Sequence, residues 1–507
     1  MTRADRFVVA MLFGALLTPA CLAQTEDTAQ QREQDRFNCF LVVAGKECTT
    51  DGSVIVAHNE DSGNDRPVHF WKVEAAEHEK GERKLRRGGS VSFAPHTHGY
   101  IWCQMPGLEF SDTYFNEHGV CVISNGCTSR EDRPDLTDGG IAFMLRRIVA
   151  ARAKSAREGI EIATSLLGQF GYADTGRCLV VADAQEAWLL NMVRGKHWAA
   201  ARVPDDQCAV VANHYTIHTV DPEDTDNFML SPGLIDYAKS RGWYDPDRDG
   251  TFDFATVYGA DSARQHKSNI RRAWRANNLL RQGASEEQWQ QPTFVTPDKK
   301  LSITDLMAVL RDHCEDTPYD ESESFTKHSP YETGEPTICA ERTSFSTIFQ
   351  LRSRYPASIG SIMWIAMCRP DSSFYVPWFA GINSIPRGLN GSDVAIATRD
   401  HFDDAFLEQP APVTFNAIRA FETALESVYG EFLPVLQAEQ EKFEAAQVTG
   451  IQQIEATAHV MHKRNPDTAR AYLTAYSHGQ QLRANRLLEQ LAQTLTETTT
   501  PDRKGSR

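Results

Sequence analysis

The sequence predicts a layered α+β domain followed by a helical extension. Between residue 39 and about residue 260, short apolar runs of strand length alternate with turn-rich segments. Within this region, the stretch from Ile141 to Leu167 has apolar residues at helical spacing, separated by Arg, Lys and Glu. A second group of apolar runs follows between residues 345 and 381. Strands mixed with long helices are typical of domains in which helices pack against sheets.

The predicted strands are short runs rich in β-branched and aromatic residues. The first two, CFLVVAG (39–45) and SVIVAH (53–58), flank the turn-rich KECTTDG and predict a β-hairpin. The others are GVCVIS (119–124), CLVVADA (178–184), AWLLNMV (187–193), CAVVAN (208–213), FSTIFQLR (345–352), SIMWIAM (361–367) and FYVPWFAG (374–381).

Pro410 and Pro412 mark a boundary after the main domain, which we assign to residues 39–408. Apolar residues then recur at helical spacing, and the segment rich in Ala, Gln, Glu and Leu predicts helices over residues 413–495. A coiled-coil partner helix is the alternative, but sustained heptads are missing. The remaining residues, 496–507, are expected to form a disordered tail.

Composition excludes several classes of function. The chain has 507 residues, of which 41% are hydrophobic and 24% charged, as in soluble globular proteins. The formal net charge of −16 disfavours nucleic acid and anionic membrane surfaces as partners, because both bind basic patches. Oligomeric state does not follow from composition, so a homo-oligomer stays open.

The first residues are typical of a secretory signal peptide. Arg3 and Arg6 precede the apolar run from Phe7 to Leu17, and small residues then lead to Ala23. The run is too short to span a bilayer. We therefore expect residues 1–23 to be a signal peptide and the protein to be secreted or periplasmic.

Two alternatives to this interpretation remain. Cys21 offers a lipoprotein anchor, although the residues before it match a lipobox poorly, and the apolar run also fits a buried helix. The next segment, residues 24–38 (QTEDTAQQREQDRFN), carries almost nothing that can be buried. It is typical of a spacer or pro-segment.

Cys39 is the first residue of the predicted fold. A cysteine at the head of a strand is usually a small core residue. Cys39 differs because it follows a polar spacer and opens a hairpin whose second strand ends in HNED, residues 58–61. A tight hairpin returns the end of its second strand to its first residue, so a thiol and two carboxylates are expected at one end of the sheet.

Such a residue can carry its own general base if the chain is cut before it. A free α-amine has an unperturbed pKa of roughly 7.7–8.0 and accepts a proton near neutral pH. A thiol, with a pKa of about 8.5, needs less activation than a hydroxyl. Removal of residues 24–38 would turn Cys39 into a nucleophile with a built-in base.

The motifs in order resemble those of the peptidase C69 family of N-terminal nucleophile hydrolases, whose best-known members are bacterial dipeptidases. The pattern begins with Cys39, GK at 45–46, DGS at 51–53 and NED at 59–61. It continues to about residue 400 through MPGLEFSDTYFNEHGV (105–120), TDGGIAFMLRRIVAARAKSAREG (137–159), ANHYTIH (212–218), NFMLSPGLIDYAKSRGWYDP (227–246) and SIMWIAMCRPDSSFYVPWFAG (361–381).

The resemblance implies a four-layer αββα sandwich, here with a helical C-terminal extension. It also implies autocatalytic removal of residues 24–38, with Cys39 as nucleophile and its α-amine as base. By similarity to the wider superfamily, which includes bile-salt hydrolases and penicillin V acylase, Asp61 orients the amine. Asn125 and Asn213 then help to bind the amine or the oxyanion.

One position departs from the superfamily pattern. His58 stands where a basic arginine is usual, so an ionic role there is in doubt, because histidine is neutral or charged around neutral pH. His58 and Arg342 are the substrate-binding candidates. Arg342 is the candidate for the missing positive charge, with a surface salt bridge as its alternative role.

The function that follows is a secreted cysteine dipeptidase that cleaves short peptides without a cofactor. The first alternative is an N-acyl amide hydrolase, similar to penicillin V acylase or bile-salt hydrolase, because the same catalytic residues serve both. The second is a non-catalytic binding protein similar to the secernins. A preference for substrates with a free α-amine favours the dipeptidase.

Metal ligation is not expected from the sequence. DPDRDGTFD (245–253), with Asp245, Asp247 and Asp249, resembles half of a calcium loop, but Thr256 occupies the position of the bidentate glutamate. An Asp-rich turn that caps a helix is the preferred interpretation, and a weak structural calcium site is the alternative. His96 and His98 lack a third ligand in the sequence and are interpreted as surface residues.

The remaining cysteines give few signals. Cys48 lies in the predicted hairpin turn and is the weaker rival nucleophile. Most others lie in apolar runs and are expected in the core. Cys314 and Cys339 are the only pair considered as a disulfide.

Overall fold

The computed structural model describes residues 39–61, 67–85, 87–104, 111–133, 136–283, 290–320, 329–331, 336–390 and 411–499. The predicted signal peptide (1–23), the spacer (24–38) and the domain boundary at 408 lie outside these residues.

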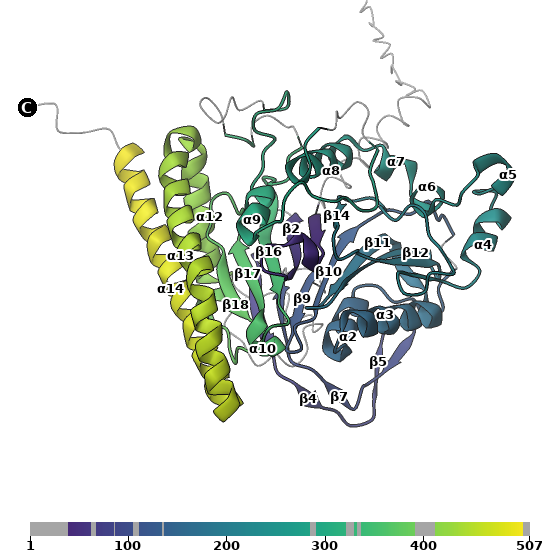
Figure 1. Cartoon of the computed structure of the whole chain (residues 1–507), viewed down its shortest axis with the longest axis horizontal. Coiled ribbons are helices and arrows are strands. Elements are labelled where there is room, and N and C mark those ends of the chain that lie inside the picture. Colours follow the sequence, from purple (N-terminus) through teal and green to yellow (C-terminus); the bar gives the residue numbers. More distant parts are fainter. Residues whose placement is uncertain are drawn as a thin grey trace, which may run out of the picture.

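Two antiparallel sheets form the centre of the domain (Figure 1). The smaller has the order β14-β1-β2-β16-β17-β18, and the larger has the order β15-β13-β12-β11-β10-β9-β8-β3. Strands of the smaller sheet are β1 (Phe40–Ala44), β2 (Val54–Asp61), β14 (Cys208–Val211), β16 (Thr343–Leu351), β17 (Ser361–Met367) and β18 (Val376–Phe379). Strands of the larger sheet are β3 (His69–Val73), β8 (Tyr100–Gln104), β9 (Thr113–Asn116), β10 (Cys121–Gly126), β11 (Tyr172–Ala182), β12 (Ala187–Gly195), β13 (Trp198–Arg202) and β15 (Phe228–Leu230).

Two small ribbons extend from the larger sheet. They pair β4 (Ala76–Glu77) with β7 (His96–Thr97), and β5 (Glu82–Lys84) with β6 (Ser90–Ser92).

Helices cover the outer faces of both sheets, which gives the layers helix, sheet, sheet, helix (Figure 1). Helices α2 (Met144–Arg152) and α3 (Ala156–Phe170) pack on the larger sheet, and α9 (Ile303–Leu310) packs on β2 and β16 of the smaller one. The connecting helices are α4 (Leu234–Ser240), α5 (Pro246–Asp249), α6 (Phe254–Tyr258), α7 (Asp261–Arg264), α8 (Lys267–Leu280) and α10 (Ala357–Gly360), with the 3-10 turns η1 (Lys46–Cys48) and η3 (Arg387–Leu389). The predicted layered α+β class is confirmed.

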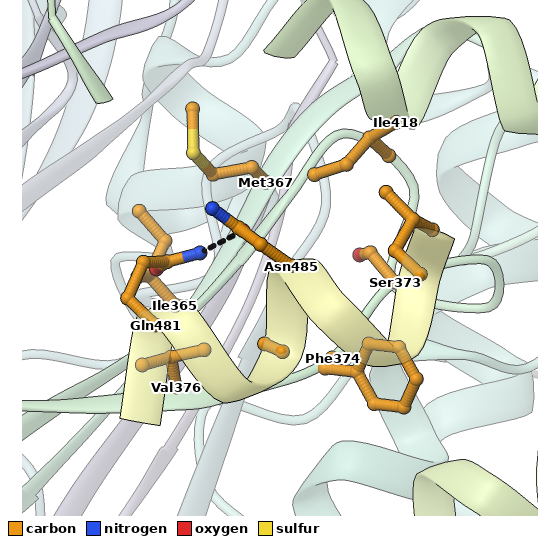
Figure 2. A pocket seen from close by; sticks show the side chains of 10 residues that line it. Ile365, Met367, Ser373, Phe374, Val376, Ile418, Gln481 and Asn485 are labelled. Carbon is orange, nitrogen blue, oxygen red and sulfur yellow. Dashed lines mark hydrogen bonds between the residues drawn. The ribbon is translucent and has the colours of Figure 1, made fainter. Parts of the chain in front are cut away.

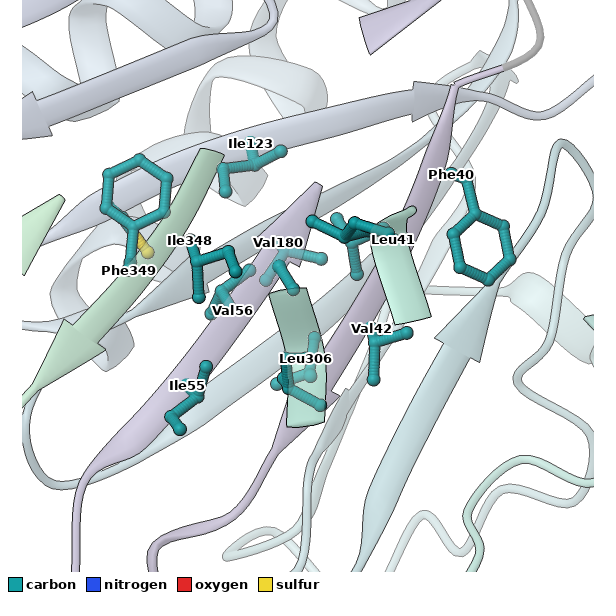
Figure 3. Close-up of a cluster of buried hydrophobic side chains, with 14 of the residues drawn as sticks. Phe40, Leu41, Val42, Ile55, Val56, Ile123, Val180, Leu306, Ile348 and Phe349 are labelled. Carbon is teal, nitrogen blue, oxygen red and sulfur yellow. The ribbon is translucent and has the colours of Figure 1, made fainter. Parts of the chain in front are cut away.

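The main hydrophobic core lies between the two sheets (Figure 3). Because side chains alternate along a strand, Leu41 and Val56 face Ile123 and Val180 of the larger sheet. The alternate residues of β1 and β2 point to the opposite face of the smaller sheet, where Leu306 of α9 covers them. Both faces of β1 and β2 are therefore buried, which explains their nearly continuous apolar sequences.

Three C-terminal helices flank the β17–β18 side of the smaller sheet (Figure 1). They are α12 (Val413–Glu426), α13 (Tyr429–Arg464) and α14 (Pro466–Thr499). A cavity of about 20 Å³, room for about one water, remains between β17, β18, α12 and α14. Figure 2 shows its lining, in which Gln481 donates a hydrogen bond to Asn485 at 2.9 Å. The packing is thus nearly complete.

Two details differ from the sequence-based expectations. The helical pattern from Ile141 to Leu167 forms two helices, because Ala153 is extended and Ser155 caps α3 by accepting a hydrogen bond from Glu158 N. Helix α14 continues to Thr499, past the predicted end at residue 495, and residues 500–507 lie outside the described part. Among the described helices, none has the length and apolar character needed to cross a membrane.

Candidate active site

Cys39 lies where the first hairpin closes. Phe40 pairs with Asn59, so the residue before β1 lies beside Glu60 near the end of β2. The Cys39 thiol donates a hydrogen bond to Glu60 Oε1 at 3.3 Å, and both side chains are buried. The predicted hairpin is confirmed, and it brings a thiol and a carboxylate into contact.

The two neighbouring carboxylates of β2 point to opposite faces of the sheet, as the strand pleat requires. Glu60 shares its face with Cys39 and points toward the larger sheet. Asp61 points toward α8, where Arg272 Nη1 lies 4.0 Å from Asp61 Oδ2. On the same side, Thr343 Oγ1 donates a hydrogen bond to Asp61 Oδ1 at 2.6 Å. The two carboxylates are thus placed for different tasks.

Asn125 and Asn213 approach the same residue from two other strand ends. Asn125, near the end of β10, donates from Nδ2 to Cys39 O at 3.2 Å and to Val211 O at 2.9 Å. Asn213 follows β14, which pairs with β1, and donates from Nδ2 to Gly126 O at 3.0 Å. The structure therefore brings the four residues predicted as catalytic, Cys39, Asp61, Asn125 and Asn213, into one site.

Arg272 joins this site and was not among the residues expected from the sequence. It lies on α8, is almost fully buried, and donates to Cys39 O at 3.3 Å and to Asn213 Oδ1 at 3.0 Å. A signal was present in the sequence: Arg272 lies on the same helical face as the buried residues Ala276 and Leu280. A charge on an apolar face is rarely buried without a partner.

Burial dominates the electrostatics of the site. It raises the pKa of the Cys39 thiol well above its usual value, with a further rise from the charge of Glu60. Burial and the charge of Asp112 likewise raise the pKa of Glu60. Burial raises the pKa of Asp61 to about 7, against the lowering effects of Arg272 and of the Thr343 hydrogen bond. The thiol in this arrangement needs a base before it can attack.

His58 is buried in the same cluster and is neutral at neutral pH, because burial lowers its pKa to about 4. Its Nδ1 lies 3.5 Å from Thr113 Oγ1, and its Nε2 lies 3.9 Å from Glu60 Oε2. The geometry thus offers a neutral hydrogen-bonding group at this position and not a cation.

Arg272 supplies a buried positive charge at the site, in addition to that of Arg342, the candidate from the sequence. Arg342 is half-buried, and its charge lowers the pKa of Asp61 less than Arg272 and Thr343 do. Arg342 therefore lies within electrostatic reach of the site, whereas Arg272 makes the direct contacts.

Several buried polar atoms of the site make no hydrogen bond with any described residue. They are Glu60 Oε2, Asp61 Oδ2, Asn125 Oδ1 and His58 Nε2. Buried oxygens of this kind are normally paired, so the cluster is suited to a group that brings several hydrogen-bond donors.

A second buried ionic group supports the site from the larger sheet. Asp112 precedes β9 and contacts Arg146 Nη1 at 2.6 Å and Arg177 Nη1 at 3.0 Å, and Ser124 Oγ donates to it. Although burial opposes it, the two arginines hold the pKa of Asp112 below its usual range. Its negative charge therefore persists and contributes to the raised pKa of Glu60.

The possible metal-ligand atoms of Cys39, His58 and Glu60 lie within 4.8 Å of one another, a set that also suits a metal ion.

In the segment that resembles half a calcium loop, Asp245 caps α5 by accepting a hydrogen bond from Asp247 N, and Asp249 pairs with Arg248. The helix-capping interpretation of this segment is confirmed.

The disulfide considered between Cys314 and Cys339 is not formed, and all described cysteines are free. Cys339 Sγ instead lies 3.5 Å from the hydroxyl of Tyr331. Cys48, the rival nucleophile, is buried in η1, and its thiol interacts with that of Cys208. It lies away from Cys39, at the other end of β1.

Comparison with known proteins identifies the family. Residues 38–406 match Peptidase family C69, so the match begins one residue before Cys39 and includes the whole site. The chain belongs to peptidase family C69.

Two curated proteins that are similar to this chain are named as probable dipeptidases. A probable dipeptidase of Salmonella dublin is 31% identical over 71% of this chain and 85% of its own length. A probable dipeptidase of Latilactobacillus sakei is 26% identical over 91% of this chain and 95% of its own length. Among solved structures, penicillin V acylase from Agrobacterium tumefaciens covers 67% of this chain and 85% of its own, with 12% identity and a TM-score of 0.32. A likeness that low carries no argument about function.

Proposed function

We propose that this C69 peptidase is a dipeptidase that cleaves short peptides with a free α-amine, using Cys39 as an N-terminal nucleophile. The observation that carries the proposal is the contact between the Cys39 thiol and Glu60, at 3.3 Å. It places a carboxylate beside the reacting atom, where a dipeptide carries its ammonium group.

Removal of residues 1–38 would give Cys39 a free α-amine among groups suited to hold it. Asp61 Oδ2 and Asn125 Oδ1 are buried acceptors that receive no hydrogen bond from the described residues, and an ammonium group brings additional donors. The raised pKa of the buried thiol makes a nearby base necessary, and an α-amine with an ordinary pKa of roughly 7.7–8.0 supplies it. Residues 1–23 would direct the precursor out of the cytoplasm.

The proposed reaction has two stages. The α-amine takes the thiol proton, the thiolate sulfur bonds to the peptide carbonyl carbon, and the carbonyl oxygen becomes an oxyanion. The carbon–nitrogen bond then breaks, and the leaving amine takes the proton from the α-ammonium group. Water then attacks the carbonyl carbon of the thioester and gives a proton to the α-amine of Cys39. The carbon–sulfur bond breaks, the sulfur takes that proton back, and the acid and the thiol are released. Asn213 is the proposed oxyanion donor, a role commonly worth about 3 kcal/mol.

Glu60 separates the dipeptidase from the acylase. In a dipeptide the ammonium nitrogen lies two bonds, about 2.5 Å, from the carbonyl carbon that the sulfur attacks. A carboxylate in contact with that sulfur is therefore within reach of the ammonium group. An N-acyl substrate has no cation there and gains no ion pair with Glu60, which favours dipeptides over N-acyl amides.

The test compares dipeptides with their N-acetylated forms and with penicillin V. Glu60→Gln should lower kcat/KM for free dipeptides by about 10–100-fold, because it removes a charge-assisted hydrogen bond of about 1.5–3 kcal/mol. The same change should leave the slower N-acetylated substrates unaffected. Glu47→Gln, an exposed change in the same hairpin, is the matched control.

Three results would contradict the proposal. Faster cleavage of penicillin V or N-acetylated peptides than of free dipeptides would identify an acylase. Unchanged hydrolysis in Cys39→Ala would remove Cys39 from the reaction, and absence of hydrolysis of all three substrate types would favour a non-catalytic protein.

A further inference from the structure

Three histidines and a glutamate meet at the end of the larger sheet that faces away from Cys39. His96 and His98 lie just before β8, and Glu117 and His118 lie just after β9. Tyr100 of β8 pairs with Asn116 of β9, so the residues before one strand meet those after the other. Strand β9 begins at Thr113, beside the candidate active site, and ends at this cluster.

The ligand atoms of His96, His98 and Glu117 converge, and His118 adjoins this group through its contact with His98. His118 Nε2 lies 3.2 Å from His98 Nδ1, and Glu117 Oε1 lies 3.9 Å from the same nitrogen. The ligand atoms of His96, His98 and Glu117 lie within 4.8 Å of one another. Two nitrogens bound to a tetrahedral metal at about 2.0–2.1 Å are about 3.3 Å apart, so the His98–His118 spacing already matches one edge of such a site.

The surrounding structure holds these side chains in place. Glu77 of β4 accepts a hydrogen bond at 2.7 Å from His96 Nδ1, which leaves the His96 Nε2 lone pair for a ligand. The Asn116 side-chain oxygen accepts hydrogen bonds from His118 N and Val120 N, each at 3.0 Å, and fixes the turn after β9. The turn ends at Gly119, whose φ of 75° favours glycine.

We propose that His96, His98, Glu117 and His118 bind one divalent transition-metal ion of the zinc class. Imidazole and carboxylate ligands suit such ions, and a histidine whose other nitrogen contacts a carboxylate is typical of metal sites. The ion takes the place of the proton between His98 and His118; the ring that carried this proton takes one up on its other nitrogen from solvent, so both imidazoles bind as neutral ligands. His96 is 45% exposed, so the ion enters from that side.

The metal would fasten the β4–β7 ribbon to the sheet and to α2. His98 N donates a hydrogen bond to Ala151 O of α2 at 2.8 Å, and His96 belongs to the ribbon. Because Cys39 lies at the opposite end of β9, the ion has a structural role and takes no part in peptide hydrolysis. The sequence did not predict the site, because Glu117 and His118 are remote along the chain from the His-Thr-His segment at residues 96–98.

The test is a titration of the untagged, full-length protein with Co²⁺, a spectroscopic substitute for Zn²⁺. We expect one ion per chain and the intense visible absorption of tetrahedral Co²⁺. His96→Ala and His118→Ala should each weaken binding at least about tenfold, and Glu77→Gln should weaken it by about 10-fold or more. His78→Ala, an exposed histidine near the same ribbon, should leave binding unchanged.

Zn²⁺ should also raise the melting temperature of the wild type and of His78→Ala, but not of His118→Ala. None of the variants replaces the buried His98, so none of them removes a buried side chain of this cluster. This choice of variants limits misfolding as a cause of lost binding. Equal Co²⁺ affinity in all variants, or no tetrahedral absorption in the wild type, would show that the His98–His118 contact is only a hydrogen bond.

Discussion

At the residue scale, the neighbouring carboxylates of β2 differ because each meets a different environment. Glu60 faces the thiol and the negative charge of Asp112, whereas Asp61 faces Arg272 and Thr343. Burial raises the pKa of both, but Asp61 has the Arg272 guanidinium 4.0 Å away, and its pKa is about 7. Asp61 is therefore the group of the site most sensitive to pH near neutrality.

Asp61→Asn should change the pH dependence of stability. The folded chain holds the Asp61 proton more tightly than the unfolded chain does, so the stability from this group is complete below about pH 4. It is lost as the pH rises through about 7. In the Cys39→Ala background, the free energy of unfolding of Asp61→Asn relative to its parent should therefore rise by about 2–3 kcal/mol from about pH 5 to about pH 8.

Urea denaturation at the two pH values measures this difference. Asp236→Asn, a change at an exposed carboxylate, is the control and should show no such rise. A difference for Asp61→Asn that stays constant with pH would mean that Asp61 ionises normally in the folded chain.

At the element scale, local pattern predicted the strands that carry the site but not the order in which they assemble. The hairpin of β1 and β2 follows from two apolar runs around a short turn, and it places Glu60 beside Cys39. The neighbour of β2 on its other side is β16, which begins at Thr343. A pairing so remote along the chain leaves no local signal, so the contact between Thr343 and Asp61 could not be predicted.

The resemblance to the C69 family supplied Asn125 and Asn213, which no spacing rule would place beside Cys39. Arg272 shows the limit of both approaches. Residues 267–280 contain no catalytic motif, and the apolar Ala276 and Leu280 on the same face of α8 are the only sign that Arg272 is buried. The sequence therefore predicts the nucleophile and its strand, whereas the electrostatic partners depend on tertiary packing.

The C-terminal helices are joined to the main domain by a buried ion pair. Arg311, just after α9, donates to both carboxylate oxygens of Glu444 on α13, at 2.8 and 2.6 Å. Tyr375 N donates to the same carboxylate. Glu444→Ala should lower the free energy of unfolding by about 1.5–3 kcal/mol, because it removes the charge-assisted hydrogen bonds of the partly exposed Arg311 to this carboxylate.

Urea denaturation also measures this prediction, with Glu441→Ala, an exposed change on the same helix, as control. Equal stabilities of the two variants would show that the Arg311–Glu444 ion pair does not help to hold α13 on the main domain.

At the scale of the whole molecule, the site is complete only when distant segments meet. The start of β1, the end of β2, the end of β10, the second residue after β14 and one helix each provide a group. All of them converge on Cys39, which is preceded in the chain by 38 residues. The central claim is that these residues are removed and that the reaction begins with the α-amine so exposed.

Intact mass combined with N-terminal sequencing of the active protein tests that claim most directly. We predict a mature chain that begins at Cys39, and a Cys39→Ala variant that keeps residues 24–38 and lacks dipeptidase activity. An active wild-type chain that begins at Gln24 and stays so during turnover would contradict the account.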